Sequence, residues 1–156
     1  MRIWILRHGQ AEAMAASDEH RALTDAGCKE VLAMAAQLAD EPLQAILASP
    51  YRRAQETANL VQQQLQTLRG VSTAAWLTPD DDPRQALSFL TERSESTLLL
   101  VSHQPLVSQL ISLLVEGNTS GHYPMPTAGL ACIDLDLPAA GLGELRLLTS
   151  PALLHS

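Results

Sequence analysis

Aromatic side chains are scarce in this chain of 156 residues, which contains one Phe, two Tyr and two Trp. A core of any size must therefore be built from aliphatic Leu, Ala, Val and Ile side chains. Hydrophobic residues make up 46% of the chain and charged residues 17%, values that are typical of globular proteins and argue against disorder. The length suits one domain, and we expect residues 1–156 to form it.

Positive charge is also scarce, because ten Lys and Arg stand against 17 Asp and Glu and the formal net charge is −7. Nucleic-acid binding needs a basic face that attracts the phosphate backbone, so no nucleic-acid partner is expected. In such an acidic chain a cluster of arginines would form a pocket for one small anion.

Long apolar runs and cysteine frameworks are both missing. The N-terminal apolar run is too short for a signal peptide, and no other run reaches the length of a membrane span. The two cysteines, Cys28 and Cys132, lie in apolar patterns and are expected to be small core residues. We therefore expect a soluble cytoplasmic monomer without membrane contact.

Strands and helices are predicted to alternate along the chain. Continuous apolar runs predict buried strands over 3–6, 45–48 and 98–101, and weaker patterns predict strands over 73–77, 129–137 and 144–148. Helical spacing and proline or serine starts predict helices over 25–40, 83–90, 105–115 and from Ser49-Pro50 through Leu68 to a break at Gly70. This alternation predicts a three-layer α/β/α fold around a mostly parallel sheet.

Charged and polar residues follow three of the predicted strands. Arg7-His8-Gly9 follows the first, Ser49-Pro50 with Arg53 follows the second, and Ser102-His103 follows the strand over 98–101. Ligands of open α/β sheets bind at the carboxyl ends of the strands. The predicted helix N-termini at Pro50 and Pro105 would point backbone N–H groups at the same edge, which favours an anion site.

A phosphoryl group suits these residues. Guanidinium groups match phosphate oxygens and stay charged, and a neutral imidazole is a competent nucleophile. We expect His8 to accept the phosphoryl group, while Arg7, Arg53 and His103 hold its oxygens in the transition state. Gly9 would allow backbone or substrate to come close to His8.

Four segments in order resemble those of the histidine phosphatase superfamily, also called phosphoglycerate mutase-like. They are Leu6-Arg7-His8-Gly9, Leu23-Thr24-Asp25-Ala26-Gly27, Ser49-Pro50-Tyr51-Arg52-Arg53-Ala54-Gln55-Glu56-Thr57-Ala58 and Val101-Ser102-His103. The resemblance implies a phosphoglycerate mutase-like fold, His8 as the phosphorylated nucleophile, a phosphate pocket of Arg7, Arg53 and His103, and no cofactor or metal.

Within that superfamily the chain most resembles the small SixA-type protein phosphohistidine phosphatases. The short length, Arg21 ahead of Leu23-Thr24, Leu77-Thr78-Pro79 and the segment Ser102-His103-Gln104-Pro105-Leu106-Val107 carry this resemblance. It implies that Arg21, and with it Gln104, contacts the substrate. Arg21 could also be a solvated loop charge.

Several residues have competing interpretations. The motif frame favours Arg53 over its neighbour Arg52 as the phosphate ligand. The run 80–82 of three aspartates could bind a metal with a histidine, but a turn between prolines is the commoner use of such a run. Glu12 could transfer a proton, whereas His20, His122 and His155 lie in polar or terminal segments and have no strong claim to a role.

Three functions are compatible with these motifs. The first is a phosphatase for a phosphorylated histidine on a partner protein, such as a histidine phosphotransfer domain or a phosphocarrier. The second is a phosphatase or mutase for small phosphoesters, and the third is a phospho-binding module without catalysis. The short segment between the second predicted helix and His103 favours the first, because it would leave the pocket open to a protein surface and supply no dedicated general acid.

Overall fold

A six-stranded sheet forms the centre of the protein in the computed structural model, which describes residues 1–66 and 70–154. The sheet contains β1 (Arg2–Arg7), β2 (Ala45–Ala48), β3 (Val71–Thr73), β4 (Thr97–Ser102), β5 (Leu130–Asp134) and β6 (Glu144–Thr149). The spatial order is β3-β2-β4-β1-β5-β6. The first four strands run parallel, β5 runs antiparallel to β1, and β6 runs antiparallel to β5 and so in the direction of the first four, which confirms the predicted mostly parallel sheet.

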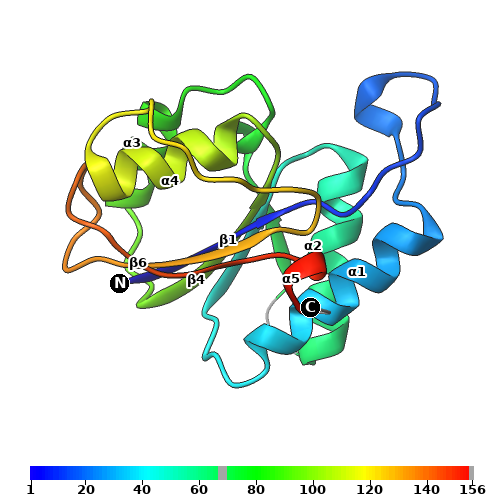
Figure 1. The fold of residues 1–156 in the computed structure, drawn as a ribbon, viewed down its shortest axis with the longest axis horizontal. Helices are drawn as coiled ribbons and strands as arrows, with labels where there is room; N and C mark the ends of the chain where they lie inside the picture. Colours follow the sequence, from blue (N-terminus) through cyan, green and yellow to red (C-terminus); the bar gives the residue numbers. More distant parts are fainter. Residues whose placement is uncertain (67–69, 155–156) are drawn as a thin grey trace.

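Helices cover both faces of this sheet (Figure 1). On one face lie α1 (Asp25–Ala35), α2 (Arg52–Leu65) and the short α5 (Pro151–Leu154), and on the other lie α3 (Pro83–Thr91) and α4 (Leu106–Glu116). Short 3-10 turns are η1 (Asp18–His20), η2 (Ala36–Leu38) and η3 (Ala75–Leu77). The predicted three-layer α/β/α fold is thus confirmed.

The core divides into two clusters, because alternate residues of each strand point to opposite faces. Ile3 and Ile5 of β1 face the cluster that contains α3 and α4, whereas Trp4 and Leu6 face the cluster that contains α1 and α2. Strands β1 and β4 are central and buried on both faces, which is why their sequences read as unbroken apolar runs. As expected, the core is largely aliphatic; Cys132 is buried in it, while Cys28 is only partly buried.

Three local predictions are wrong. The predicted strand over 73–77 is displaced: β3 ends at Thr73, and residues 75–77 form η3. The helix over 25–40 ends as α1 at Ala35 and continues only as the 3-10 turn η2. Ser49 does not cap α2, which begins at Arg52 after Tyr51. Its hydroxyl instead forms a hydrogen bond with Nε2 of His103 just after the end of β2. Leu68, assigned to the same helix, lies outside the described residues.

Across residues 1–66 and 70–154, no helix is both long and apolar enough to span a bilayer.

Candidate active site

Three neighbouring strands bring the histidines together. His8, Ser49 and His103 each come directly after a strand, namely β1, β2 and β4. Arg7 is in register with Ser102, and Ala48 with Val101, so the following residues lie side by side at the carboxyl edge of the sheet. The backbone N–H groups of His8 and Ser49 donate to carbonyl oxygens of β4 at 3.0 Å, which fixes both residues to the strand between them.

His8 is held with one ring nitrogen free to react. Its Nδ1 lies 2.7 Å from the carbonyl oxygen of Gly9, and because a carbonyl only accepts, Nδ1 must carry the proton. The other nitrogen, Nε2, then has a lone pair and accepts from Nε of Arg53 at 3.3 Å. Burial, together with Arg53, Arg7 and Arg21, lowers the pKa of His8 to about 4, against a smaller opposing effect of the Gly9 hydrogen bond. His8 is therefore a neutral base.

His103 lies beside His8, with ring centroids 5.1 Å apart. Its Nε2 lies 2.7 Å from the Ser49 hydroxyl, and the ring of Tyr51 meets it edge-on at 5.0 Å. Burial, followed by the proximity of His8 and Arg53, lowers the pKa of His103 to about 3. Its Nδ1 is buried without a hydrogen-bond partner among the described residues, an uncommon condition in folded proteins that calls for an explanation.

Arg53 projects from the first turn of α2 into the same site. It is only 3% exposed, whereas its neighbour Arg52 points outward and pairs with Glu56 on the helix surface. The structure thus places Arg53, and not Arg52, beside His8, in agreement with the motif frame. A guanidinium group buried to this degree needs partners, and besides His8 it finds them in η1.

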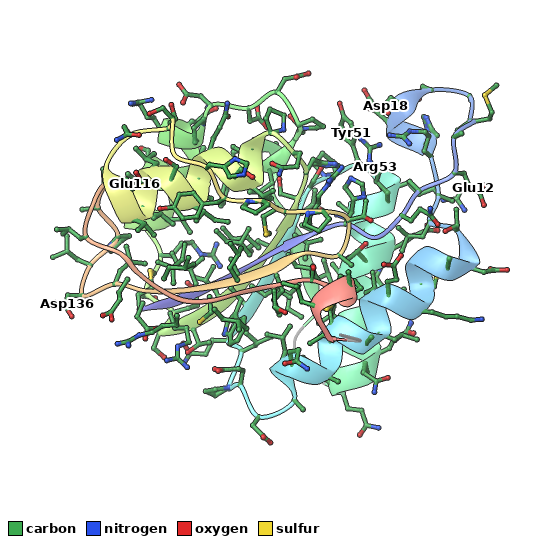
Figure 2. All side chains as sticks on the ribbon, viewed as in Figure 1. Glu12, Asp18, Tyr51, Arg53, Glu116 and Asp136 are labelled. Carbon is green, nitrogen blue, oxygen red and sulfur yellow. The ribbon has the colours of Figure 1, made fainter. Side chains whose placement is uncertain are left out.

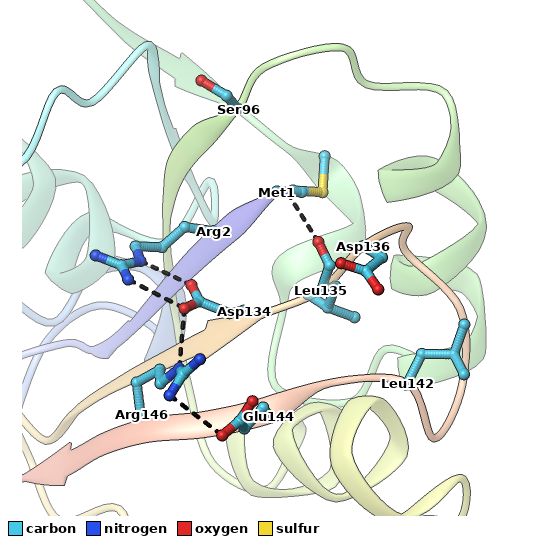
Figure 3. Close-up of a pocket in the computed structure, with 9 residues that line it drawn as sticks. All are labelled: Met1, Arg2, Ser96, Asp134, Leu135, Asp136, Leu142, Glu144 and Arg146. Carbon is cyan, nitrogen blue, oxygen red and sulfur yellow. Dashed lines mark hydrogen bonds and ion pairs between the residues drawn. The ribbon is translucent and has the colours of Figure 1, made fainter.

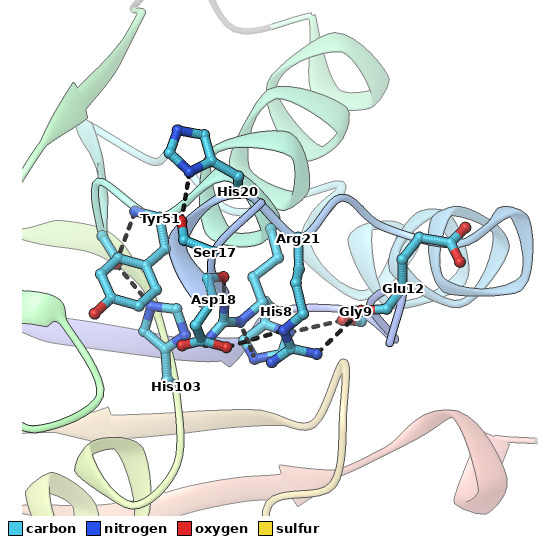
Figure 4. A network of polar contacts seen from close by, with 11 residues as sticks. His8, Gly9, Glu12, Ser17, Asp18, His20, Arg21, Tyr51 and His103 are labelled. Carbon is cyan, nitrogen blue, oxygen red and sulfur yellow. Dashed lines mark hydrogen bonds and ion pairs between the residues drawn. The ribbon is translucent and has the colours of Figure 1, made fainter. Parts of the chain in front are cut away.

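The partner in η1 is Asp18, a residue that the sequence motifs do not single out. Nη1 of Arg53 donates to the Asp18 carbonyl at 2.7 Å, and Nη2 lies 3.2 Å from the Asp18 carboxylate. Arg21 approaches the same carboxylate from the solvent side, with Nε at 2.9 Å, and donates to the Glu12 carbonyl at 3.2 Å. Figure 4 shows this network around His8. Arg21 thus lines the site and is tied to it through Asp18, and its contact with a substrate stays a prediction.

Arg7 and Gln104 share one backbone acceptor. Nη1 of Arg7 donates to the carbonyl of Met125 at 3.0 Å, and the Gln104 amide donates to the same carbonyl at 3.3 Å and to Ser108 at 2.6 Å. Nε of Arg7 has no partner within the described chain, and burial together with Arg53 lowers the pKa of this guanidinium. Gln104 lines the pocket, but its amide nitrogen is committed to holding the 123–126 loop.

These residues line a surface pocket of about 480 Å³. Its lining residues are Arg7, His8, Gln10, Ala11, Asp18, Arg21, Tyr51, Arg53, Pro79, Asp80, His103, Gln104 and Thr127. Figure 2 shows Asp18, Tyr51 and Arg53 together at one end of the molecule, far from Glu116 and Asp136. The predicted phosphate residues are therefore brought together in one open cavity.

A second cavity, of about 420 Å³, lies at the opposite end of β1 (Figure 3). Its charges neutralise one another: Asp134 pairs with both Arg2 and Arg146, and Arg146 also pairs with Glu144. Both arginines of this cavity are paired with carboxylates, whereas Arg7 at the site around His8 has no carboxylate partner among the described residues.

The remaining candidates lie apart from the chemistry or serve the fold. Asp82 caps α3 and Asp81 binds Thr78, whereas Asp80 lines the pocket. The Glu12 side chain points away from His8 in Figure 4. His20 bonds Ser17 on the exposed loop, His122 is exposed, and His155 lies outside the described residues. Among the residues described, no three His, Cys, Asp or Glu side chains are grouped so as to hold a metal ion.

The motif glycines and Thr57 explain how the loop after β1 is held. The Gly9 N–H donates to the Thr57 hydroxyl at 3.1 Å, and that hydroxyl donates to the Arg53 carbonyl at 2.7 Å. A Cβ atom on Gly27 would lie 2.2 Å from the carbonyl oxygen of Gln10, so only glycine lets α1 approach this loop. These motif positions set the backbone that carries His8.

Comparisons with known proteins agree with the fold and the motifs. A family model described as the histidine phosphatase superfamily (branch 1) matches residues 3–76. The phosphohistidine phosphatase SixA of Escherichia coli strain K12 is 33% identical over 141 residues, covering 87% of this chain and 86% of the relative. A SixA homologue of Haemophilus influenzae is 34% identical over 143 residues, covering 83% of this chain and 87% of the relative.

A solved structure of the protein histidine phosphatase SixA complexed with tungstate superposes with a TM-score of 0.88, at 33% identity and with 99% of each chain covered. The chain belongs to the histidine phosphatase superfamily, as its sequence motifs indicate. It is accordingly a hydrolase of the phosphatase class.

Proposed function

We propose that this protein is a phosphohistidine phosphatase that removes the phosphoryl group from a phosphorylated histidine on a partner protein, either a histidine phosphotransfer domain or a phosphocarrier. The observation that carries the proposal is the geometry of His8, whose unprotonated Nε2 stands in an open pocket beside Arg53. The likeness to SixA over most of the chain supports the same substrate class.

In the first step, Nε2 of His8 attacks the phosphorus atom. A new N–P bond forms as the P–N bond to the substrate imidazole breaks, and the electron pair of that bond goes to the substrate nitrogen, which takes a proton from water. In the second step, water attacks the phosphorus of phospho-His8, releasing inorganic phosphate and restoring the neutral ring. The proton stays on Nδ1 throughout, and its hydrogen bond to the Gly9 carbonyl stabilises the phosphorylated ring.

Arg7, Arg53 and His103 are proposed to hold the phosphoryl oxygens during transfer. Charge spreads over these oxygens in the transition state, and the fixed donors of two guanidinium groups and a neutral imidazole stabilise it in a partly buried site without reorganisation. Arg7 has an unused Nε donor, and His103 has a buried ring nitrogen without a partner. Arg21 is proposed as a further phosphate contact at the solvent side, whereas Gln104 acts by positioning the Met125 carbonyl.

The surroundings of the pocket favour imidazole over an alkoxide as the leaving group. An alkoxide must be protonated as it leaves, which requires a carboxylic acid held near it. Both carboxylate oxygens of Asp18 bind arginines, and Asp81 and Asp82 are engaged in their own loop. Imidazole departs without such an acid, and the open pocket can admit a histidine that stands on a protein surface.

The decisive test compares a phosphohistidine protein with a panel of small phosphoesters. Wild-type enzyme should turn over the phosphohistidine protein at least about a hundredfold faster, in line with the effect of a general acid that is missing. The variant His8→Ala should lose turnover, and rapid quenching of the wild type should trap acid-labile phosphate on His8. His122→Ala removes an exposed histidine outside the pocket and serves as the matched control.

The position of Asp80 favours the alternative, a phosphatase for small phosphoesters, because this residue lines the pocket and is exposed. If Asp80 were a general acid, Asp80→Asn would abolish phosphoester turnover in an enzyme that prefers phosphoesters. That pair of results would overturn the phosphohistidine assignment.

A further inference from the structure

Each nitrogen of the Arg53 guanidinium group has a hydrogen-bond acceptor in the free protein. Its Nε donates to His8, and its two terminal nitrogens donate to the carbonyl and the carboxylate of Asp18. A phosphoryl group that approaches these nitrogens from the pocket competes with their acceptors. His8 releases Nε only when its lone pair forms the N–P bond, and the Asp18 carbonyl is part of the backbone of η1, so the carboxylate is the acceptor that can move when the phosphoryl group binds.

The exposure of the two side chains agrees with this choice. The Arg53 side chain is 4% exposed and fixed, whereas the Asp18 side chain is 58% exposed and projects from a 3-10 turn of three residues. The carboxylate spans two arginines, with one oxygen 2.9 Å from Arg21 and the other 3.2 Å from Arg53. Two anionic oxygens shared between two guanidinium groups offer the same contacts that two phosphoryl oxygens would make.

We propose that the Asp18 carboxylate is a built-in competitor of the phosphoryl group, which holds Arg53 and Arg21 in the free enzyme, yields them when the phosphoryl group binds and takes them back as phosphate leaves. This inference rests on the proposed function, because it takes the pocket to be a phosphoryl site. Asp18 thereby sets the affinity of the site for substrate and product without touching the reacting atoms.

Competition of this kind helps turnover. Arg7, Arg21 and Arg53 converge on one pocket, and such a site would retain the phosphate dianion that each cycle produces. When the Asp18 carboxylate returns to the arginines, it replaces the contacts that they lose as phosphate leaves. It thereby promotes the release of phosphate. Interactions that stabilise the bound substrate and the transition state equally do not accelerate the chemical step. Weakening such interactions therefore has little effect on kcat.

The ionisation of Asp18 provides a second, independent readout. Partial burial tends to raise its pKa, but hydrogen bonds from Arg21 and Arg53 outweigh this effect and lower it below the ordinary value. If phosphate replaces the carboxylate at the arginines, that stabilisation disappears and the pKa of Asp18 must rise. By linkage, protonation of Asp18 must strengthen phosphate binding by the same factor.

The test is calorimetric titration of the full-length enzyme with inorganic phosphate and with tungstate. Asp18→Asn keeps the side-chain size but removes the charge, and it should bind both anions about threefold to tenfold more tightly, the effect of one partly exposed ion pair. Product inhibition by phosphate should become stronger by the same factor. Glu19→Gln, which removes an equal charge from the next residue of the same turn, is the matched control and should change affinity by less than about twofold.

Weaker anion binding by Asp18→Asn would mean that Asp18 only positions Arg53, and an effect no larger than that of Glu19→Gln would mean that the carboxylate does not stand in the place of phosphate. Either result overturns the inference. In the wild type, the carboxyl carbon signal of Asp18 should report a higher pKa at saturating phosphate, and an unchanged pKa also overturns it. Because the probe is inorganic phosphate, these outcomes do not depend on whether phosphohistidine is the substrate.

Discussion

Neutral, buried imidazoles are the main residue-level property of the site. Burial is the main cause that lowers the pKa of His8 to about 4 and that of His103 to about 3, and Arg53 acts on both in the same direction. In the unfolded chain both groups should protonate near the ordinary value of about 6.5. Between these values the unfolded chain binds protons that the folded chain does not, so stability falls as the pH drops from about 6.5 toward 4.

We therefore predict that the ring signals of His8 and His103 do not titrate between pH about 8 and 5.5 in the folded protein. Two-dimensional NMR of the imidazole C–H groups, with the urea-unfolded chain as the reference, measures this directly. A folded-state midpoint near 6.5 for His8 would contradict the prediction and would mean that burial does not lower the pKa of this imidazole.

The neighbouring arginines of α2 provide a second test at the scale of single residues. Arg53→Lys removes the fork that meets His8 and the phosphoryl oxygens, and it should lower kcat/KM by about a hundredfold or more. Arg52→Lys alters only an exposed pair with Glu56 and should leave kcat/KM within about twofold. Steady-state kinetics on the same substrate measures both, and similar losses in the two variants would contradict the placement of Arg53.

At the scale of elements, the approach of α1 to the loop after β1 controls where His8 stands. A methyl group on Gly27 would collide with the backbone of Gln10, whereas one on Gly70 would meet no atom of the described residues within 4 Å. Gly27→Ala should therefore destabilise the fold by about 2 kcal/mol or more and reduce activity, because the loop must shift. Gly70→Ala is the control, and thermal unfolding should show it to be within about 0.5 kcal/mol of the wild type.

Elements with a strong local signal could be predicted from the sequence, and contacts between distant segments could not. The apolar runs of β1, β2 and β4 gave those strands, and the parallel arrangement then placed His8 and His103 at one edge. The contact of Asp18 with Arg53 joins residues 35 apart, and that of Ser49 with His103 joins residues 54 apart. The segment between β1 and α1 has no periodicity that could predict such a contact. The predicted boundaries of β3 were wrong because a strand of three residues has too little sequence pattern to be located.

At the scale of the whole molecule, the acidic chain and its cationic pocket form a consistent arrangement. A net charge of −7 is spread over the protein, while Arg7, Arg21 and Arg53 gather at the carboxyl edge of the sheet. Such a distribution disfavours long polyanions but admits a single phosphoryl group. The helices and strands that supply these residues come from the first two thirds of the chain, where the motifs also lie, whereas β5 and β6 complete the sheet on its other side.

This arrangement leads to the last prediction, that turnover needs no divalent cation. In the proposed function, guanidinium groups from three separate segments meet the charge of the phosphoryl group, and the described residues contain no group of three potential metal ligands. Exhaustive dialysis against a chelator should therefore leave kcat and KM for the phosphohistidine protein within about twofold, as expected when arginines supply the electrostatic stabilisation. Asp81 and Asp82 bind within their own loop, which leaves Asp80 as the carboxylate of that run at the pocket. The contradicting result would be a loss of activity that magnesium or zinc restores in the wild type but not in Asp80→Asn. It would assign this loop to a metal site and show that arginines alone do not supply the electrostatic stabilisation.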